Sequence, residues 1–238
     1  MFRVVVVTGA NKGIGVVVVT GANKGIGYMF PSLDVMDPAS VASLADFIKK
    51  QFGKLDLLVV GSKAKMLKEI LKEGYEQSEA CLGTNYYGVK HVTKALLPLL
   101  QKSNSARLVN LMSHERAKEE LGDVNGLTEE KVDEVVKGFL KDVKEGLQES
   151  KGWPINFSIY MVSKAALNAY TRILTKTYPN IAINAVCPGS VKTYINYNCG
   201  IATVKKGAKS PVMLALMPDG GPSGIFYSCI NRKNVVLI

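Results

Sequence analysis

The stretch VVVVTGANKGIGVVVVTGANKGIG, residues 4–27, decides the fold of this chain, and it is one dodecapeptide written twice without a spacer. Each VVVV run is short, β-branched and bounded by a glycine-containing turn, which predicts a buried strand. The following TGANKGIG segment has glycines spaced so that the backbone can approach a pyrophosphate, which the N-terminus of a following helix would help to bind. Neither copy is a triphosphate-binding P-loop, because no Ser or Thr follows Lys12 or Lys24.

Strands and helices alternate along the rest of the chain. Asp37 and Pro38 are typical of a helix N-cap and first turn, and Gly53 suits the C-cap of the same helix. The strand LDLLVV follows at 55–60, and the order strand, helix, strand predicts a parallel sheet. Further helices are expected at 88–102, after Thr128 and at 158–176, and further strands at 107–111, 181–187 and 224–227.

Composition indicates a single domain that spans residues 1–238, and a cytoplasmic protein. The chain is 47% apolar and 21% charged, and no apolar run approaches the roughly 18 residues of a membrane span. Its net charge is +10, but most lysines are interleaved with acidic residues, which indicates solvated helix faces rather than a nucleic-acid-binding patch. The positive charge also produces a field that attracts small anions. The four cysteines and two histidines lack metal-like spacing, so we expect reduced thiols and no metal site.

Tyr160 and Lys164 stand four residues apart on a predicted helix, so their side chains share one face. An isolated phenol titrates near pH ~10, and a neighbouring ammonium lowers its pKa toward the range in which it exchanges protons near neutrality. The pair is a candidate acid–base site. Helical neighbours of these two types also occur for purely structural reasons.

Several segments, in order, carry a resemblance to the short-chain dehydrogenase/reductase family. They are TGANKGIG, LDV at 33–35, TNYYG at 84–88, RLVNLMS at 107–113, YMVSK at 160–164 and NAVCPGSVKT at 184–193. The long segment between Ser113 and Tyr160 is similar to the plant branch of carbonyl, salutaridine and menthone reductases, where this insert implies a monomer. The resemblance implies an α/β fold with a Rossmann-like, doubly wound parallel sheet.

The resemblance assigns roles to four residues at the reaction centre. It implies that Tyr160 donates a proton to a substrate carbonyl, and that Lys164 lowers the pKa of Tyr160 and binds the nicotinamide ribose. Ser113 aligns with the serine that hydrogen-bonds the carbonyl oxygen. Asn85 matches the asparagine that holds a water and completes a proton relay.

NADP is the cofactor that the resemblance implies. Pro188 and Gly189 are expected to shape the nicotinamide pocket and Thr193 to contact the cofactor, while Lys12 or Lys24 would meet the ribose 2′-phosphate. The expected loop contacts are Gly21, Asn23, Lys24, Gly25, Ile26 and Gly27 with Asp34 beyond them, or Gly9, Asn11, Lys12, Gly13 and Gly15 of the first copy.

The cofactor half departs from the family pattern. Gly15 is followed by a second VVVV run and Gly27 by YMFP, so neither copy is followed by a proper helix. We expect the family's first helix, second strand and second helix to be missing. VVGS at 59–62 also replaces the family's Asn-Asn-Ala-Gly segment.

Two placements of the repeat are compatible with the sequence. The second copy can supply the first strand and its loop, or both VVVV runs can enter the sheet with the second in the place of a missing strand. Continuity with LDV favours the second copy as the working loop. In both placements the sheet loses helical cover on one face, and parallel sheets are stable when both faces are buried.

Two functions of different classes follow. The first is an NADP-dependent reductase of a ketone or aldehyde, in which hydride leaves the nicotinamide and Tyr160 protonates the oxygen. The apolar and tyrosine content of residues 194–212 suits a small hydrophobic or terpenoid-like carbonyl. The alternative is a non-catalytic remnant that acts as a binding or regulatory module, because the cofactor half is damaged.

Overall fold

The structure is a computed structural model, and it describes residues 4–8, 17–20, 26–29, 33–61, 74–111, 121, 126–154, 157–192, 197–228 and 233–236. The strands form one eight-stranded sheet in the order β3-β2-β1-β4-β5-β6-β7-β8. They are β1 (Val4–Thr8), β2 (Val17–Thr20), β3 (Ile26–Met29), β4 (Leu57–Gly61), β5 (Arg107–Leu111), β6 (Ala182–Cys187), β7 (Ile225–Ser228) and β8 (Lys233–Val236). The helices are α1 (Pro38–Phe52), α3 (Tyr75–Leu82), the π-helix η1 (Gly83–Tyr87), α4 (Gly88–Leu100), α5 (Glu129–Glu145), α6 (Ser158–Thr177) and α7 (Val204–Ala215).

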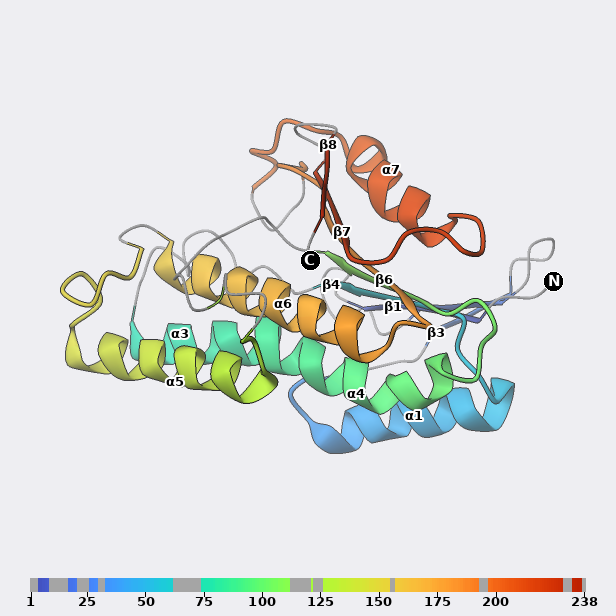
Figure 1. Ribbon diagram of the computed structural model, residues 1–238, viewed down its shortest axis with the longest axis horizontal. Coiled ribbons are helices and arrows are strands. Elements are labelled where there is room, and N and C mark those ends of the chain that lie inside the picture. The colour runs from blue at the N-terminus through green and yellow to red at the C-terminus, as the bar shows by residue number, and fades with distance from the viewer. Residues whose placement is uncertain are drawn as a thin grey trace.

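The centre of the sheet is parallel, from β1 through β4, β5 and β6 to β7. Helices cover both faces: α1, α4 and α6 lie on one side and α7 on the other, while α5 packs against α3 and α6 (Figure 1). The expected α/β fold with a doubly wound, Rossmann-like parallel sheet is therefore confirmed.

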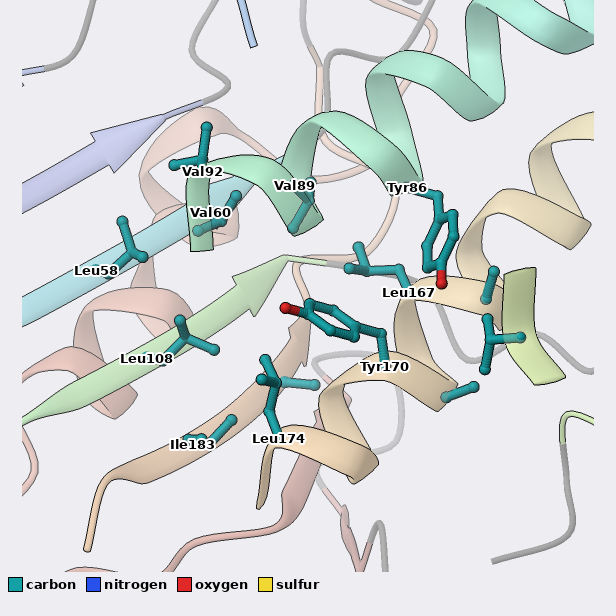
Figure 2. Packing of buried hydrophobic residues seen from close by; sticks show 14 of the residues in the cluster. Leu58, Val60, Tyr86, Val89, Val92, Leu108, Leu167, Tyr170, Leu174 and Ile183 are labelled. Atoms are coloured by element: carbon teal, nitrogen blue, oxygen red, sulfur yellow. The ribbon is translucent and has the colours of Figure 1, made fainter. Parts of the chain in front are cut away.

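The larger core lies between the sheet and the helices α4 and α6. Side chains that alternate along β4, β5 and β6 point toward these helices, as expected for a strand period of two. Tyr86 and Tyr170 meet edge to face there, with ring centroids 6.4 Å apart. Figure 2 shows these rings with Leu58, Val60, Val89, Val92, Leu108, Leu167, Leu174 and Ile183.

The opposite face of the sheet has a smaller core under α7. Leu214 and Ala215 pack there on buried residues of β4, β5 and β6. Val5 and Val7 of β1 face the same side but are only partly buried. In the described part of the chain, no helix other than α7 covers this face, which agrees with the expected loss of helical cover.

Capping residues set the ends of the helices where the sequence predicted them. The Asp37 side chain accepts a hydrogen bond from Ala39 N, and Pro38 opens α1. Gly53 ends that helix with φ 72°, a left-handed conformation that glycine adopts without steric cost. Thr128 caps α5 by accepting from Lys131 N.

Both copies of the repeat contribute a strand, but only the first contributes one to the parallel core. β1 pairs parallel with β4, whereas β2 pairs antiparallel with β1. Residues 9–16 alone separate β1 from β2, too few for the crossover of about a dozen residues that a parallel neighbour requires. The expectation that the second copy supplies the first strand is therefore wrong, and the placement in which both runs enter the sheet is confirmed.

The second copy also differs from prediction at its end. Ile26 and Gly27 were expected in a phosphate-binding loop, yet both lie in β3, where they pair antiparallel with Thr20 and Val19. Backbone groups that pair within a sheet are not free to bind a phosphate. These two residues are therefore corrected from loop to strand.

Besides β3, the elements α3, α7 and β8 were not predicted from the sequence. The outer strands β2 and β3 extend the sheet beyond β1 by antiparallel pairing, and the described residues include no helix between β1 and α1. No helix in the described ranges combines the length and hydropathy needed to cross a membrane.

Candidate active site

The parallel strands end side by side at one edge of the sheet. In the ladder Thr8 pairs with Val60, Gly61 with Leu111, and Leu111 with Val186. The segments that follow β1, β4, β5 and β6 therefore all leave from the same edge. In open α/β sheets this carboxyl edge is where ligands bind.

Tyr160 and Lys164 lie in the first two turns of α6. The Lys164 Nζ atom is 5.5 Å from the centroid of the Tyr160 ring, so the two side chains share a face as their spacing predicted. Lys164 is only 6% exposed. Burial lowers its pKa to about 8, and the nearby thiols of Cys81 and Cys187 oppose this shift. A lysine poised this close to neutrality can exchange a proton.

Asn85 lies in the π-helical turn η1, between α3 and α4. A π-turn widens a helix by one residue and frequently marks a functional site. The Asn85 side chain is buried, and its Nδ2 atom lies 3.2 Å from both Ser163 Oγ and Cys81 Sγ. Because Ser163 directly precedes Lys164, this contact brings Asn85 to the helix that carries the acid–base pair.

Two glycines let the turn before α1 approach η1 closely. A Cβ at Gly88 would lie 2.6 Å from Val35 Cγ2, and one at Gly83 would lie 2.7 Å from Met36 Cε. Asp34 itself is exposed, and its carboxylate accepts a hydrogen bond from Met36 N. Val35 and Met36 thus pack closely against the two ends of the π-helical turn that contains Asn85.

The edge also offers features that suit a bound ligand. Pro188 and Gly189 directly follow β6, and Gly189 turns the chain with φ 76°. Thr8, at the end of β1, is buried, and its Oγ1 atom has no hydrogen-bond partner among the described residues. A buried hydroxyl in this state favours a polar ligand.

The structure brings together Tyr160, Lys164 and Asn85, and adds Ser163 and Cys81, which the sequence did not single out. Ser163 follows Tyr160 by three residues and Cys81 precedes Asn85 by four, the spacings of helical neighbours. That spacing could have identified Cys81 had α3 been predicted. Other expected site residues lie outside the described ranges: Gly9, Asn11, Lys12, Gly13, Gly15, Gly21, Asn23, Lys24, Gly25, Ser113 and Thr193.

Comparison with known sequences agrees with the Rossmann-like fold and identifies the family. Residues 28–123 match the short chain dehydrogenase family. Short-chain dehydrogenase/reductase 1 from Saponaria officinalis is 46% identical over 283 aligned positions, which cover 95% of this chain and 94% of the relative. The alignment is longer than this chain of 238 residues, so the relative carries residues that this chain lacks. Carbonyl reductase (NADPH) 3 from Mus musculus is 33% identical, over 91% of each chain.

Among solved structures, salutaridine reductase from Papaver somniferum matches with a TM-score of 0.74 and 43% identity, over 82% of this chain and 80% of that chain. This chain belongs to the short-chain dehydrogenase/reductase family, with plant reductases among its relatives. The family resemblance of the sequence motifs is thereby confirmed.

Proposed function

We propose that this protein is an NADP-dependent reductase that converts a ketone or aldehyde to an alcohol. The observation that carries the proposal is the convergence of Tyr160, Lys164 and Asn85 at the carboxyl edge of the parallel sheet. Relatives named as a salutaridine reductase and an NADPH carbonyl reductase support the same chemistry. A small hydrophobic or terpenoid-like carbonyl is the proposed substrate class.

Each side chain of the site has a distinct task in the proposed reaction. NADPH, when bound, supplies the hydride that attacks the carbonyl carbon. The Tyr160 hydroxyl gives its proton to the carbonyl oxygen, and Ser113 donates a hydrogen bond to that oxygen. Lys164 stabilises the tyrosinate that remains and returns a proton to it, a role that its pKa of about 8 suits.

For the pyrophosphate, we propose the loop of the first copy rather than that of the second. The first loop follows Thr8, which lies at the carboxyl edge of the sheet. The second loop follows Thr20, which pairs with Val4 and therefore lies at the opposite edge. Lys12, in the first loop, is then the basic residue that meets the ribose 2′-phosphate.

The described residues fit the nicotinamide end of the cofactor. Pro188 and Gly189, which follow β6, suit a polar, planar ligand at this edge. The buried Thr8 hydroxyl, which has no partner among the described residues, precedes the proposed pyrophosphate loop and suits a polar ligand there. Thr193 is proposed to contact the nicotinamide end. Asp34 has a local structural role in its turn, where it accepts a hydrogen bond from Met36 N, and we propose that it also borders the adenosine side.

Replacing Tyr160 tests the proposed reaction. Tyr160→Phe removes the proton donor but keeps the ring beside Lys164, so we expect NADPH oxidation with an active carbonyl to fall at least ~100-fold. Turnover is measured by the loss of nicotinamide absorbance across a panel of hydrophobic ketones and aldehydes. The matched control is Tyr178→Phe, at the far end of α6. Unchanged turnover in Tyr160→Phe would falsify the mechanism.

The assembly and location of the protein form a second part of the proposal. Because α5 packs over α3 and α6, we propose a monomer, which sedimentation velocity at micromolar concentration checks. Cys81, Cys187 and Cys199 form no disulfide, which suits a reducing compartment, and we propose the cytoplasm. Recovery of a tagged protein from a membrane or secreted fraction would contradict this location.

A further inference from the structure

We propose that Ser163 and Cys81 are positioning residues that hold the Asn85 side chain in one orientation. This inference rests on the proposed function, because it concerns the same site. Both residues lie outside the set that the family motif assigns to the reaction. Ser163 is fully buried and Cys81 is 3% exposed, so water does not compete for their contacts with Asn85.

The single proton of the Ser163 hydroxyl fixes the direction of its hydrogen bonds. Ser163 Oγ lies 2.8 Å from the carbonyl oxygen of Tyr160 and donates its proton to it. The same oxygen lies 3.2 Å from the Asn85 amide and can therefore only accept there. The group of Asn85 that faces Ser163 must then be the NH2 group.

Cys81 completes the fixation of the amide. Its Sγ atom lies 3.2 Å from Asn85 Nδ2, so each proton of the NH2 group has an acceptor. The Oδ1 atom of Asn85 consequently points away from both residues. It is buried and has no hydrogen-bond partner in the described part of the chain. A buried carbonyl in this state is an acceptor prepared for a water or a ligand group.

Ser163 thus connects the elements of the site. Its hydroxyl donates to the backbone of Tyr160, its oxygen accepts from Asn85 on η1, and its neighbour in sequence is Lys164. A displacement of η1 relative to α6 would break this connection. Ser163 therefore sets the position of Asn85 relative to the acid–base pair.

A second asparagine–hydroxyl pair on the same helix offers a matched control. Thr171 Oγ1 donates to Leu167 O and accepts from Asn110 Nδ2, both at 2.8 Å. Thr171 lies about two turns beyond Lys164. Thr171→Val removes the same type of bond from the same helix away from the acid–base pair, so it measures the structural cost alone.

The test compares Ser163→Ala with Thr171→Val by two readouts. Hydrogen exchange of the Asn85 side-chain NH2, assigned by NMR with Asn85→Asp, is expected to quicken at least tenfold in Ser163→Ala and to stay unchanged in Thr171→Val. In the kinetic readout, Ser163→Ala is expected to lower kcat by about 10- to 100-fold, while KM for NADPH stays within about twofold. Thr171→Val is expected to change neither parameter.

The exchange readout needs no turnover, so the two proposals fail separately. An inactive wild-type protein with a protected Asn85 amide would overturn the proposed function and leave the positioning role supported. Unchanged amide exchange in Ser163→Ala would overturn the positioning role whatever the activity. If Ser163→Ala does not fold, the comparison of Cys81→Ala with Cys81→Ser replaces it, because only serine keeps an acceptor for the Asn85 amide. Equal exchange of the Asn85 amide in these two variants would overturn the positioning role.

Discussion

Lys164 is a charged residue that the fold buries at a cost in stability. Its pKa is lowered to about 8 by burial, and the thiols of Cys81 and Cys187 offset only part of this shift. The pKa is depressed in the folded state, so the unfolded chain binds this proton more tightly. Below about pH 8 both states are protonated and the folded state bears the full cost. From about pH 8 to the ordinary value of 10.5 the contribution of Lys164 to stability improves.

Lys164→Met is therefore expected to raise the free energy of unfolding of the cofactor-free protein by about 2 kcal/mol at pH 7. The gain over wild type should shrink as the pH rises above 8. Urea unfolding at pH 7 and pH 10 measures both effects, with the exposed Lys137→Met on α5 as control. A variant less stable than wild type at pH 7 would show that Lys164 contributes net favourable contacts.

At the scale of elements, a cluster of charged residues between α4 and α5 attaches α5 to the rest of the molecule. Lys90 is 7% exposed, and its Nζ lies 3.0 and 2.8 Å from the two oxygens of Asp133 and 3.2 Å from Glu129. The Tyr86 hydroxyl also donates to Asp133, at 2.8 Å. Burial, together with this carboxylate, raises the pKa of Tyr86. The inserted helix is thus attached through polar groups as well as through its apolar face.

Asp133→Ala is expected to lower the free energy of unfolding by about 2 to 3 kcal/mol, because it removes a partner from a buried ammonium. Lys94→Ala is the control: Lys94 also contacts Glu129, at 2.6 Å, but is 53% exposed, so we expect a loss below about 1 kcal/mol. Denaturant titrations followed by circular dichroism give both values. Equal losses in the two variants would contradict a buried attachment of α5.

Elements with strong local signals were predictable, and those without them were not. Asp37, Pro38 and Gly53 gave the bounds of α1 because caps depend on the local chain. α7 was missed because it contains three lysines, a glycine and a proline among few buried residues. The pairing of Cys81 and Ser163 with Asn85 was missed because it depends on how α3 and η1 pack against α6.

For the molecule as a whole, the direction of each strand determines the edge of the sheet at which each glycine loop begins. Local sequence could not settle this, because the two copies are identical, and continuity with LDV favoured the second copy rather than the one that supplies β1. β1 pairs with β4, which pairs with β5, so Thr8 lies at the carboxyl edge of these strands, whereas Thr20 pairs with Val4 at the opposite edge. Deleting either copy gives the same chain, so a deletion cannot tell the loops apart. Point substitutions can.

The most direct test is a fluorescence titration of NADPH into the wild-type protein and two variants with identical local sequence, Gly13→Asp and Gly25→Asp. Each adds a carboxylate that would repel a pyrophosphate bound to its loop. We expect saturable, micromolar binding by wild type, in preference to NADH, weakened more than about tenfold by Gly13→Asp and less than about twofold by Gly25→Asp. The reverse order would mean that the second loop binds the cofactor. No binding by folded wild-type protein would mean that the chain is a non-catalytic remnant.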